Sequence, residues 1–220
     1  MGKEIKDCIL VSGAPDDDYE FLKAKIDKNK FVIAADSGYK KLLKIGITPD
    51  LIMGDFDSSE CPSENICEII KLPAEKDYTD TFYCVREAIK RGCKNLDVYC
   101  AIGDRFDHTY SNVLCLDYCK KNNVFCRIIN KKNRLSLICG ERSFKKEYDS
   151  FSLFAYLENC YGVRISGAYY TAGFFNKDEL DIGVGDQFAQ SNFVSEDLCT
   201  VSLRKGTLLL VESNDWAFFS

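Results

Sequence analysis

Acidic residues gather in four short motifs in the first half of the chain. These are Asp36-Ser37-Gly38, Gly54-Asp55-Phe56-Asp57-Ser58, Lys76-Asp77-Tyr78-Thr79-Asp80 and Gly103-Asp104-Arg105-Phe106-Asp107-His108. Like charges held close together repel each other, so such a grouping is costly unless a cation offsets it. Mg²⁺ suits this role, because it prefers oxygen ligands and usually binds through a few carboxylates together with substrate phosphates. The motifs therefore indicate phosphate chemistry supported by a divalent cation.

The second motif holds the most informative pair, Asp55 and Asp57. Past the end of an extended strand two such carboxylates can share one ion or hold two. The glycine before them, Gly54, lets the backbone come close to a ligand. Lys76 and Arg105, together with backbone amides at the starts of helices, could then receive phosphate oxygens.

A structural interpretation competes with this functional one. Four of the residues precede predicted helices and belong to types that cap helix N-termini, namely Asp36, Ser37, Thr79 and Asp107. For any one of them alone, capping is the simpler explanation, and a single histidine at a helix start is usually ordinary. Capping needs one residue and not a charged pair, so it does not explain Asp55 with Asp57. The functional interpretation depends on all the motifs occurring together.

The elements that must position these motifs alternate between strands and helices. Apolar runs predict strands at 7–13, 31–35, 51–54, 96–102 and 124–129, and helical spacing predicts helices at 19–27, 39–45, 81–91 and 109–121. This pattern predicts an α/β domain with a mainly parallel sheet covered on both faces. The carboxyl ends of parallel strands lie at one edge, where ligands bind. Three acidic motifs should therefore face one pocket, with the fourth nearby.

The remainder of the chain has a different pattern. Strand-like stretches follow one another at 135–139, 151–157, 161–165, 188–194, 199–203 and 207–212, and no long helical period separates them. This pattern predicts a small C-terminal antiparallel β-sandwich. The junction Lys131-Lys132-Asn133 suggests two domains, residues 1–132 and residues 133–220.

Composition excludes several classes of function. The chain has 220 residues, a net charge of −5 and a single histidine, His108. This charge argues against a nucleic-acid partner, and one histidine excludes a multi-histidine metal site. No apolar run approaches the length of about 20 residues that spans a bilayer. The chain also lacks a P-loop motif and a G-x-G-x-x-G motif, so the usual phosphate cradles are not used.

The cysteines bear on the compartment. There are twelve of them, none in a C-x-x-C pair, and most lie inside apolar runs. The first residues carry charges and no apolar stretch of the kind that directs export. We therefore expect reduced thiols that pack as small apolar residues in a cytoplasmic protein.

In order and spacing, the motifs resemble those of the thiamine pyrophosphokinase (thiamine diphosphokinase) family. That family's pattern reads roughly D-[GS]-G, P-D-x-I-x-G-D-F-D-S, K-D-x-T-D, G-x-R-x-D-H and a late S-N. The chain matches it over nearly its whole length, with Pro49 opening the second motif and Ser191-Asn192 as the last. It departs from the pattern at Asp104, where the family usually has glycine, and Ser37 replaces a common glycine. Leu210 falls near the place where some members have a tryptophan that stacks on thiamine.

The resemblance implies a nucleotide- and metal-binding α/β domain, followed by a β-sandwich that contributes to thiamine binding and dimerisation. It also implies a homodimer that converts ATP and thiamine into thiamine diphosphate and AMP with Mg²⁺. Carried over residue by residue, it implies catalytic roles for Asp55, Asp57, Asp80 and Arg105, the three aspartates being the metal ligands. Nucleotide binding falls to Asp36, Ser37, Gly38, Lys76, Asp77, Thr79, Asp107 and His108. Ser191 and Asn192 are expected to hydrogen-bond the pyrimidine of thiamine.

Three other functions remain open from the residues. The same fold could transfer a pyrophosphoryl group to a pterin alcohol, or use the acids to activate water as a phosphate-ester hydrolase. A non-catalytic sensor of thiamine or nucleotide is the third. A sensor has less need of so many metal ligands, so we rank it last.

Overall fold

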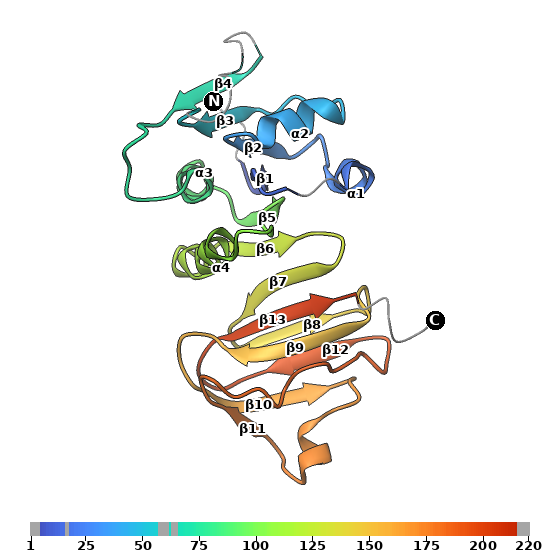
Figure 1. Ribbon diagram of the computed structural model, residues 1–220. Helices are drawn as coiled ribbons and strands as arrows, with labels where there is room; N and C mark the ends of the chain where they lie inside the picture. Colours follow the sequence, from blue (N-terminus) through green and yellow to red (C-terminus); the bar gives the residue numbers. More distant parts are fainter. Residues whose placement is uncertain (1–4, 16–17, 57–61, 63–65, 215–220) are drawn as a thin grey trace. The chain divides into compact units, whose positions relative to one another are not determined.

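The computed structural model describes residues 5–15, 18–56, 62 and 66–214 (Figure 1). The chain divides into two compact units, Met1–Lys131 and Lys132–Ser220. The division falls within the Lys131-Lys132-Asn133 segment. Asp57, one of the predicted metal ligands, lies outside the described residues.

The first unit is a parallel sheet with a helix layer on each face. Its strands are β1 (Asp7–Val11), β2 (Phe31–Ala35), β3 (Leu51–Gly54), β4 (Glu68–Lys71), β5 (Asn95–Tyr99) and β6 (Phe125–Ile129). The helices are α1 (Tyr19–Lys25), α2 (Gly38–Lys44), α3 (Asp80–Lys90) and α4 (Phe106–Lys121). Figure 1 shows α1 and α2 on one face of the sheet and α3 and α4 on the other. The mainly parallel sheet predicted from the alternation of elements is confirmed.

The order of the strands determines where a ligand can bind. Within this unit they run β4-β3-β2-β1-β5-β6, and each neighbouring pair is parallel. The chain therefore adds β2, β3 and β4 on one side of β1, then crosses over to add β5 and β6 on the other. In open α/β sheets a crevice forms where the order reverses, outside the carboxyl ends of the strands. Here that point lies between β1 and β5.

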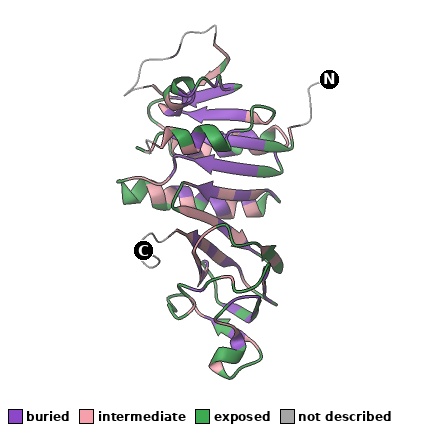
Figure 2. Ribbon diagram, turned by 90° about the vertical axis from the view of Figure 1, so that its right-hand side faces the viewer, coloured by how far each residue is buried: buried purple, intermediate pink, exposed green. Residues whose placement is uncertain are grey.

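Burial of the strands on both faces explains their continuous apolar sequences. Leu10, Val11 and Ile33 are fully buried, as are Leu51 and Ile52 (Figure 2). A strand with water on one face would alternate apolar and polar residues, whereas these strands do not, because helices cover both faces. One apolar cluster packs the side chains of α1 and α2 against alternate residues of β1, β2 and β3.

The second unit is a β-sandwich of two antiparallel sheets. Its strands are β7 (Asn133–Ile138), β8 (Glu141–Phe144), β9 (Ser150–Ala155), β10 (Cys160–Ser166), β11 (Leu180–Ile182), β12 (Cys199–Ser202) and β13 (Leu208–Ser213). One sheet contains β7-β13-β9, and the other has the order β11-β10-β12-β8. Apolar side chains from both sheets, such as Phe151 and Val163, form a single core. The predicted sandwich is confirmed.

Several predicted boundaries differ from the observed ones. The stretch 188–194 forms no strand, and only the isolated bridges of Asn192 with Phe151 and of Val194 with Ala168 occur there. Conversely, β4, β8 and β11 are strands that the apolar pattern did not predict. They are short, and backbone pairing rather than a run of apolar side chains defines them, as the sequence of β8 shows (Glu-Arg-Ser-Phe).

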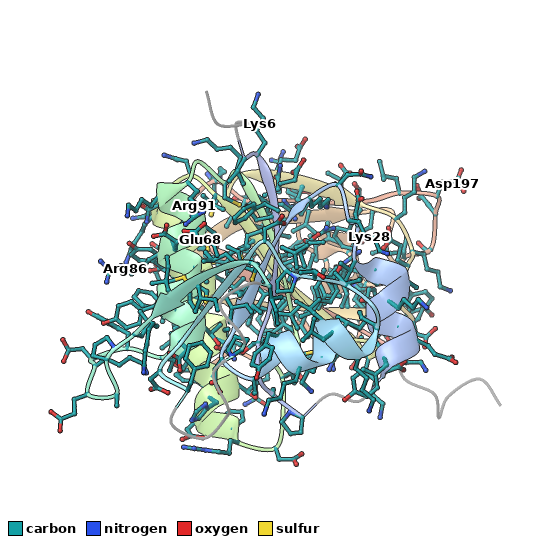
Figure 3. All side chains as sticks on the ribbon, turned by 90° about the horizontal axis from the view of Figure 1, so that it is seen from above. Lys6, Lys28, Glu68, Arg86, Arg91 and Asp197 are labelled. Atoms are coloured by element: carbon teal, nitrogen blue, oxygen red, sulfur yellow. The ribbon has the colours of Figure 1, made fainter. Side chains whose placement is uncertain are left out.

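Ion pairs tie the edge strand of the first unit to its helix layer. Both guanidinium NH₂ groups of Arg91, at the end of α3, donate to the Glu68 carboxylate of β4 at 2.9 and 2.6 Å. The two side chains are labelled next to each other in Figure 3. Because β4 has only one neighbouring strand, this contact helps to hold it on the sheet.

The cysteines in the described part of the chain are all free thiols, and most are buried as expected. Two of them depart from the predicted burial: Cys67 is only partly buried, and Cys139, which follows the last residue of β7, is exposed. No helix in the described ranges combines the length and apolar character that crossing a membrane requires.

Candidate active site

A pocket of about 780 Å³ opens at the carboxyl edge of the sheet in the first unit. Its walls include Ser12, Gly13, Ala14 and Pro15 after β1, and Ala101, Gly103, Asp104 and Arg105 after β5. It therefore lies between β1 and β5, at the point where the strand order reverses. Other lining residues come from the predicted motifs, namely Asp36, Ser37, Lys76, Asp77, Thr79, Asp80 and His108.

Two glycines allow the loops at this edge to approach one another. A Cβ added at Gly38 would lie 2.2 Å from the carbonyl oxygen of Val11, which is far too close for two non-bonded atoms. A Cβ at Gly54 would lie 2.9 Å from the Cα of Asp36. Gly38 does not line the pocket, so its contribution is to let α2 start directly against β1. Gly54 likewise brings the end of β3 next to Asp36.

Backbone strain concentrates at the same edge. Asp36, Phe56 and Cys100 have φ angles of 45°, 56° and 52°, and each follows one of the strands β2, β3 and β5. This left-handed conformation costs a non-glycine residue on the order of 1 kcal/mol or more, and such residues cluster at functional sites. The turns that they form direct the acidic motifs across the strand ends.

Asp55, Lys76 and Asp80 form a compact ionic group. The Lys76 ammonium donates to Asp55 Oδ2 and lies 3.1 Å from Asp80 Oδ1. The side chains of Lys76 and Asp55 are almost completely buried, and that of Asp80 is partly exposed. The structure thus brings together the second and third predicted motifs. Lys76, which we expected to contact the nucleotide, is the counter-ion of the two carboxylates in this state.

Burial controls the electrostatics of this group. Desolvation raises the pKa of Asp80; the Lys76 ammonium opposes the rise, and the nearby Asp55 and Asp36 add to it. Desolvation also lowers the pKa of Lys76, but hydrogen bonding and attraction to Asp55 and Asp80 outweigh it and raise the pKa. Two carboxylates therefore share one ammonium, with the Asp36 carboxylate acting on Asp80 as well, and the group as a whole favours a further cation.

The donors in this group suit Mg²⁺. Asp80 Oδ1 is buried, and although it lies 3.1 Å from the Lys76 ammonium, it makes no hydrogen bond with any described residue. A buried carboxylate oxygen without a hydrogen bond can accept a further donor or coordinate a cation. Within the described ranges no three His, Cys, Asp or Glu side chains are grouped as a complete metal site. The third predicted ligand, Asp57, lies outside those ranges, so the oxygen donors present fit the ion but form only part of the set.

The fourth motif presents its cation at the start of α4. Arg105 is largely exposed and donates to Asp107 at 2.6 and 3.2 Å. The Arg105 guanidinium lowers the pKa of the Asp107 carboxyl, and Asp107 raises the pKa of Arg105. Arg105 and His108 line the pocket, whereas Asp107 does not. Asp107 therefore orients Arg105 in this structure.

The helix-capping interpretation is confirmed for Thr79 but not for Ser37. Thr79 precedes α3, and its hydroxyl accepts a hydrogen bond from the Phe82 backbone N–H at 3.2 Å, as the capping interpretation predicts. Ser37 precedes α2 but makes no side-chain cap. Its hydroxyl is therefore not used by the helix and lies in the wall of the pocket.

The sequence analysis missed a set of polar residues at the base of the pocket. Ser12 and Thr81 are buried and share a hydrogen bond of 2.7 Å between their hydroxyls. Buried Asn112 donates to the carbonyl of Ala101 at 2.8 Å. Ser12 could have been found, because it ends an apolar run just before a glycine. Thr81 and Asn112 lie inside helices and carry no sequence signal of their own.

The predicted thiamine-binding pair lies in the second unit. Asn192 is buried, and its carboxamide accepts from the backbone N–H groups of Tyr170 and Phe193 and donates to the carbonyl of Tyr170. Its side chain therefore organises the local backbone. Ser191 is exposed and has a φ of 55°, and its backbone N–H donates to Ser152 Oγ at 3.0 Å. Of the two, Ser191 has the accessible side chain.

Comparison with known proteins supports the family suggested by the motifs. A family model for "Thiamin pyrophosphokinase, catalytic domain" matches residues 22–128. The chain is 27% identical over 216 residues to the thiamine pyrophosphokinase of Bacillus subtilis (strain 168), covering 94% of this chain and 98% of that protein.

Solved structures show the same fold over nearly the whole chain. The crystal structure of Bacillus subtilis thiamine pyrophosphokinase matches with a TM-score of 0.84 at 24% identity, covering 96% of this chain and all of that one. The thiamin pyrophosphokinase of Candida albicans matches with a TM-score of 0.74 at 16% identity, covering 95% and 90% of the two chains. With the motifs and the pocket, these matches show that the chain is similar in sequence and in fold to the thiamine pyrophosphokinases, an enzyme family whose reaction is pyrophosphoryl transfer from ATP to thiamine.

Proposed function

We propose that this protein binds ATP with Mg²⁺ in the pocket of its first unit and transfers the pyrophosphoryl group to thiamine, giving thiamine diphosphate and AMP. The observation that carries the proposal is the meeting of Asp55, Lys76 and Asp80 at the carboxyl edge of the sheet, where Lys76 and Asp80 line the pocket, together with the similarity to a family that catalyses this reaction. A triphosphate is the ligand class that both an acidic metal-binding group and nearby cations would recognise.

In the reaction, the thiamine hydroxyl oxygen forms a bond to the β-phosphorus of ATP. The bond from that phosphorus to the oxygen bridging the α-phosphorus breaks, AMP leaves with this oxygen, and the hydroxyl proton is released. Such transfers depend mainly on positioning and on stabilising charge. Arg105 is exposed in the pocket wall and held by Asp107, so it is suited to contact phosphate oxygens. We assign no general base.

Asp55 and Asp80 would hold the magnesium ion, together with Asp57. When bound, Mg²⁺ supplies positive charge that offsets the negative charge of the polyphosphate. Lys76 keeps the Asp55 and Asp80 carboxylates together, and its ammonium lies close enough to both to be shared with an incoming phosphate. Asp36, Ser37, Asp77, Thr79 and His108 line or adjoin the same space and would surround the nucleotide.

The second unit would supply contacts to thiamine and a dimer interface. An exposed group of aromatic rings supports an interface there, because monomers rarely leave such patches uncovered. It consists of Tyr169, Phe174, Phe188 and Phe193. Ser191, next to one of these rings, would hydrogen-bond the pyrimidine of thiamine. The division into a nucleotide domain and a thiamine and dimer domain remains part of this proposal, as does a cytoplasmic location, which the free thiols support.

The direct test uses purified protein with ATP, Mg²⁺ and thiamine, with AMP and thiamine diphosphate measured by chromatography. We expect the two products in equal amounts and none without the metal. A hydroxymethylpterin that displaced thiamine as acceptor would support the pterin alternative. Phosphate release without an acceptor would support the hydrolase. Thermal stabilisation by ligand without AMP would support the sensor.

A further inference from the structure

Tyr78 is an aromatic ring at the pocket that no motif assigns to a role. It lines the pocket and is 52% exposed. In the K-D-x-T-D motif it occupies the unspecified position. Single exposed aromatic residues are common on protein surfaces, so exposure alone indicates nothing. The informative feature is a half-exposed aromatic side chain that belongs to the lining of a pocket.

Neighbouring aromatic residues fix this ring in place. The Phe82 ring, one turn into α3, has its centroid 4.7 Å from that of Tyr78 at an interplanar angle of 36°. Tyr83 makes an edge contact at 6.1 Å. Phe82 is itself packed edge-on against Tyr118 of α4 at 4.9 Å. A ring held in this way loses little conformational freedom when a ligand stacks on it.

The surroundings of Tyr78 select for flat heterocycles. Asp77 and Asp80, on either side in the sequence, also line the pocket and make it electronegative. A neutral heteroaromatic ring would gain stacking energy on Tyr78, and a cationic ring would also be attracted to its π-face. Both kinds of ring occur in the proposed substrates, as the adenine of ATP and the thiazolium of thiamine.

We propose that Tyr78 is a substrate-binding residue that stacks on the heteroaromatic ring of a substrate in this pocket. The inference deepens the proposed function and rests on it for the identity of the two candidate rings. Tyr110 provides a matched comparison, since it is 51% exposed and stacks on Phe106 at a centroid distance of 6.2 Å. Tyr110 does not line the pocket, so a ligand there would not reach it.

The test measures binding of AMP and of thiamine separately, by titration calorimetry, to the wild type and four variants. These are Tyr78→Ala, Tyr78→Leu, Tyr78→Phe and Tyr110→Ala. Because both tyrosines are half exposed, all four variants should remain folded, and the thermal midpoint of each checks this. We expect Tyr78→Ala and Tyr78→Leu to raise one dissociation constant about 5- to 10-fold, the loss of one aromatic stacking contact. Tyr78→Phe and Tyr110→Ala should stay within twofold of the wild type.

The ligand affected identifies the ring. If the Tyr78 variants bind only AMP more weakly, adenine stacks on Tyr78. If they bind only thiamine more weakly, the thiamine ring stacks there. The proposal is overturned if Tyr78→Ala binds both ligands with the affinity of the wild type. It is also overturned if Tyr78→Phe loses as much affinity as Tyr78→Ala does. Wild-type turnover is measured in parallel. A wild type that binds these ligands but forms no AMP contradicts the proposed function and leaves the binding test of Tyr78 valid.

Discussion

The hydroxyl of Thr109 contacts both backbone polar groups of Gly103, accepting from its N–H at 3.1 Å and lying 3.2 Å from its carbonyl oxygen. One turn further along α4, Asn112 donates to the carbonyl of Ala101. Two side chains of one helix thus hold the loop that leaves β5. That loop ends in Arg105, the cation that we assign to phosphate binding. Helix α4 therefore determines where this cation lies.

Removing the Thr109 hydroxyl should disturb Arg105 through the loop that this hydroxyl holds. Thr109→Val keeps the shape of the side chain but leaves the Gly103 groups without their partner, which costs about 1–3 kcal/mol. We expect kcat/KM for ATP to fall about tenfold, while Thr109→Ser, which restores the hydroxyl, stays near the wild type. Steady-state kinetics with thiamine saturating measure this. Equal kinetics for the valine and serine variants would show that the loop does not depend on the hydroxyl.

Asp80→Asn should greatly reduce turnover while leaving the fold intact. The substitution keeps the size of the side chain and removes a buried charge whose Oδ1 has no hydrogen bond in the described structure. We expect kcat to fall at least about 100-fold and the half-saturating Mg²⁺ concentration to rise. Asp178→Asn, at an exposed position outside the pocket, is the matched control. Turnover near that of the wild type, with an unchanged magnesium requirement, would remove Asp80 from the metal site.

Asp57→Asn should reduce turnover at least as strongly as Asp80→Asn. This expectation comes from the Asp55-x-Asp57 spacing alone, because Asp57 lies outside the described residues. Magnesium titrations of both variants, with thermal midpoints as the control for folding, provide the check. If Asp57→Asn alone kept normal turnover, the ion would be held by Asp55 and Asp80 without it.

The ion pair between Glu68 and Arg91 should make stability depend on pH in the acidic range. Hydrogen bonds from Arg91 hold the pKa of Glu68 below its ordinary value of 4.5. A carboxyl with a lowered pKa stabilises the fold fully above its unfolded pKa, and this stabilisation is lost as pH falls through the lowered pKa. We expect the wild type to exceed Glu68→Gln by at most about 1 kcal/mol at pH 7, because the pair is half exposed. The difference should shrink as the pH falls below 4.5 and through the lowered pKa; thermal unfolding over a series of acidic pH values measures it, and a constant difference would contradict the prediction.

In the second unit, a buried ion pair should contribute more to stability than the partly exposed pair of Glu68 and Arg91. Glu212 and Arg134 face each other on β13 and β7 and form two hydrogen bonds of 2.6 Å. Their side chains are only 4% and 12% exposed. Glu212→Gln leaves a buried guanidinium partly unpaired, so we expect a loss of about 3 kcal/mol. Glu147→Gln removes an exposed partner of the same guanidinium and should cost less than about 1 kcal/mol. Chemical unfolding of both variants tests this, and equal losses would contradict it.

The location of the pocket was predictable, because parallel topology alone places strand ends together. Three acidic motifs follow apolar runs, so their convergence needed no knowledge of side-chain packing. For Asp55, Lys76 and Asp80, the sequence predicted only that the two motifs containing them lie near each other. Which cation pairs with which carboxylate depends on how deeply each side chain is buried, and the sequence pattern does not predict that burial. For this reason Lys76, expected at the nucleotide, is found between two aspartates.

Residues inside helices were the hardest to predict. Asn112 and Thr81 are ordinary polar residues in helical sequence, and only the packing of α3 and α4 on the sheet places them at the pocket. The stretch 188–194 shows the opposite problem. Its apolar residues indicated a strand, but Asn192 ties its backbone to Tyr170 through the side chain, so a strand ladder is not needed there.

Ser191 and Asn192 should respond differently to substitution, although both belong to one motif. Ser191 has a φ of 55°, a conformation that glycine adopts without cost. Ser191→Gly therefore removes the hydroxyl while relieving the backbone, and we expect little change in the thermal midpoint. If the hydroxyl binds thiamine, its loss should raise KM for thiamine about fivefold and leave KM for ATP unchanged. Ser191→Ala should give the same kinetic effect, because it lacks the same hydroxyl.

Asn192→Ala should instead lower the thermal midpoint, because it leaves the backbone groups of Tyr170 and Phe193 without their partners. Steady-state kinetics with each substrate varied in turn, together with thermal unfolding, separate the two residues. Unchanged thiamine KM in both Ser191 variants would show that the hydroxyl does not contact the substrate. The aromatic rings beside it would then be the remaining candidates for thiamine contacts in the second unit.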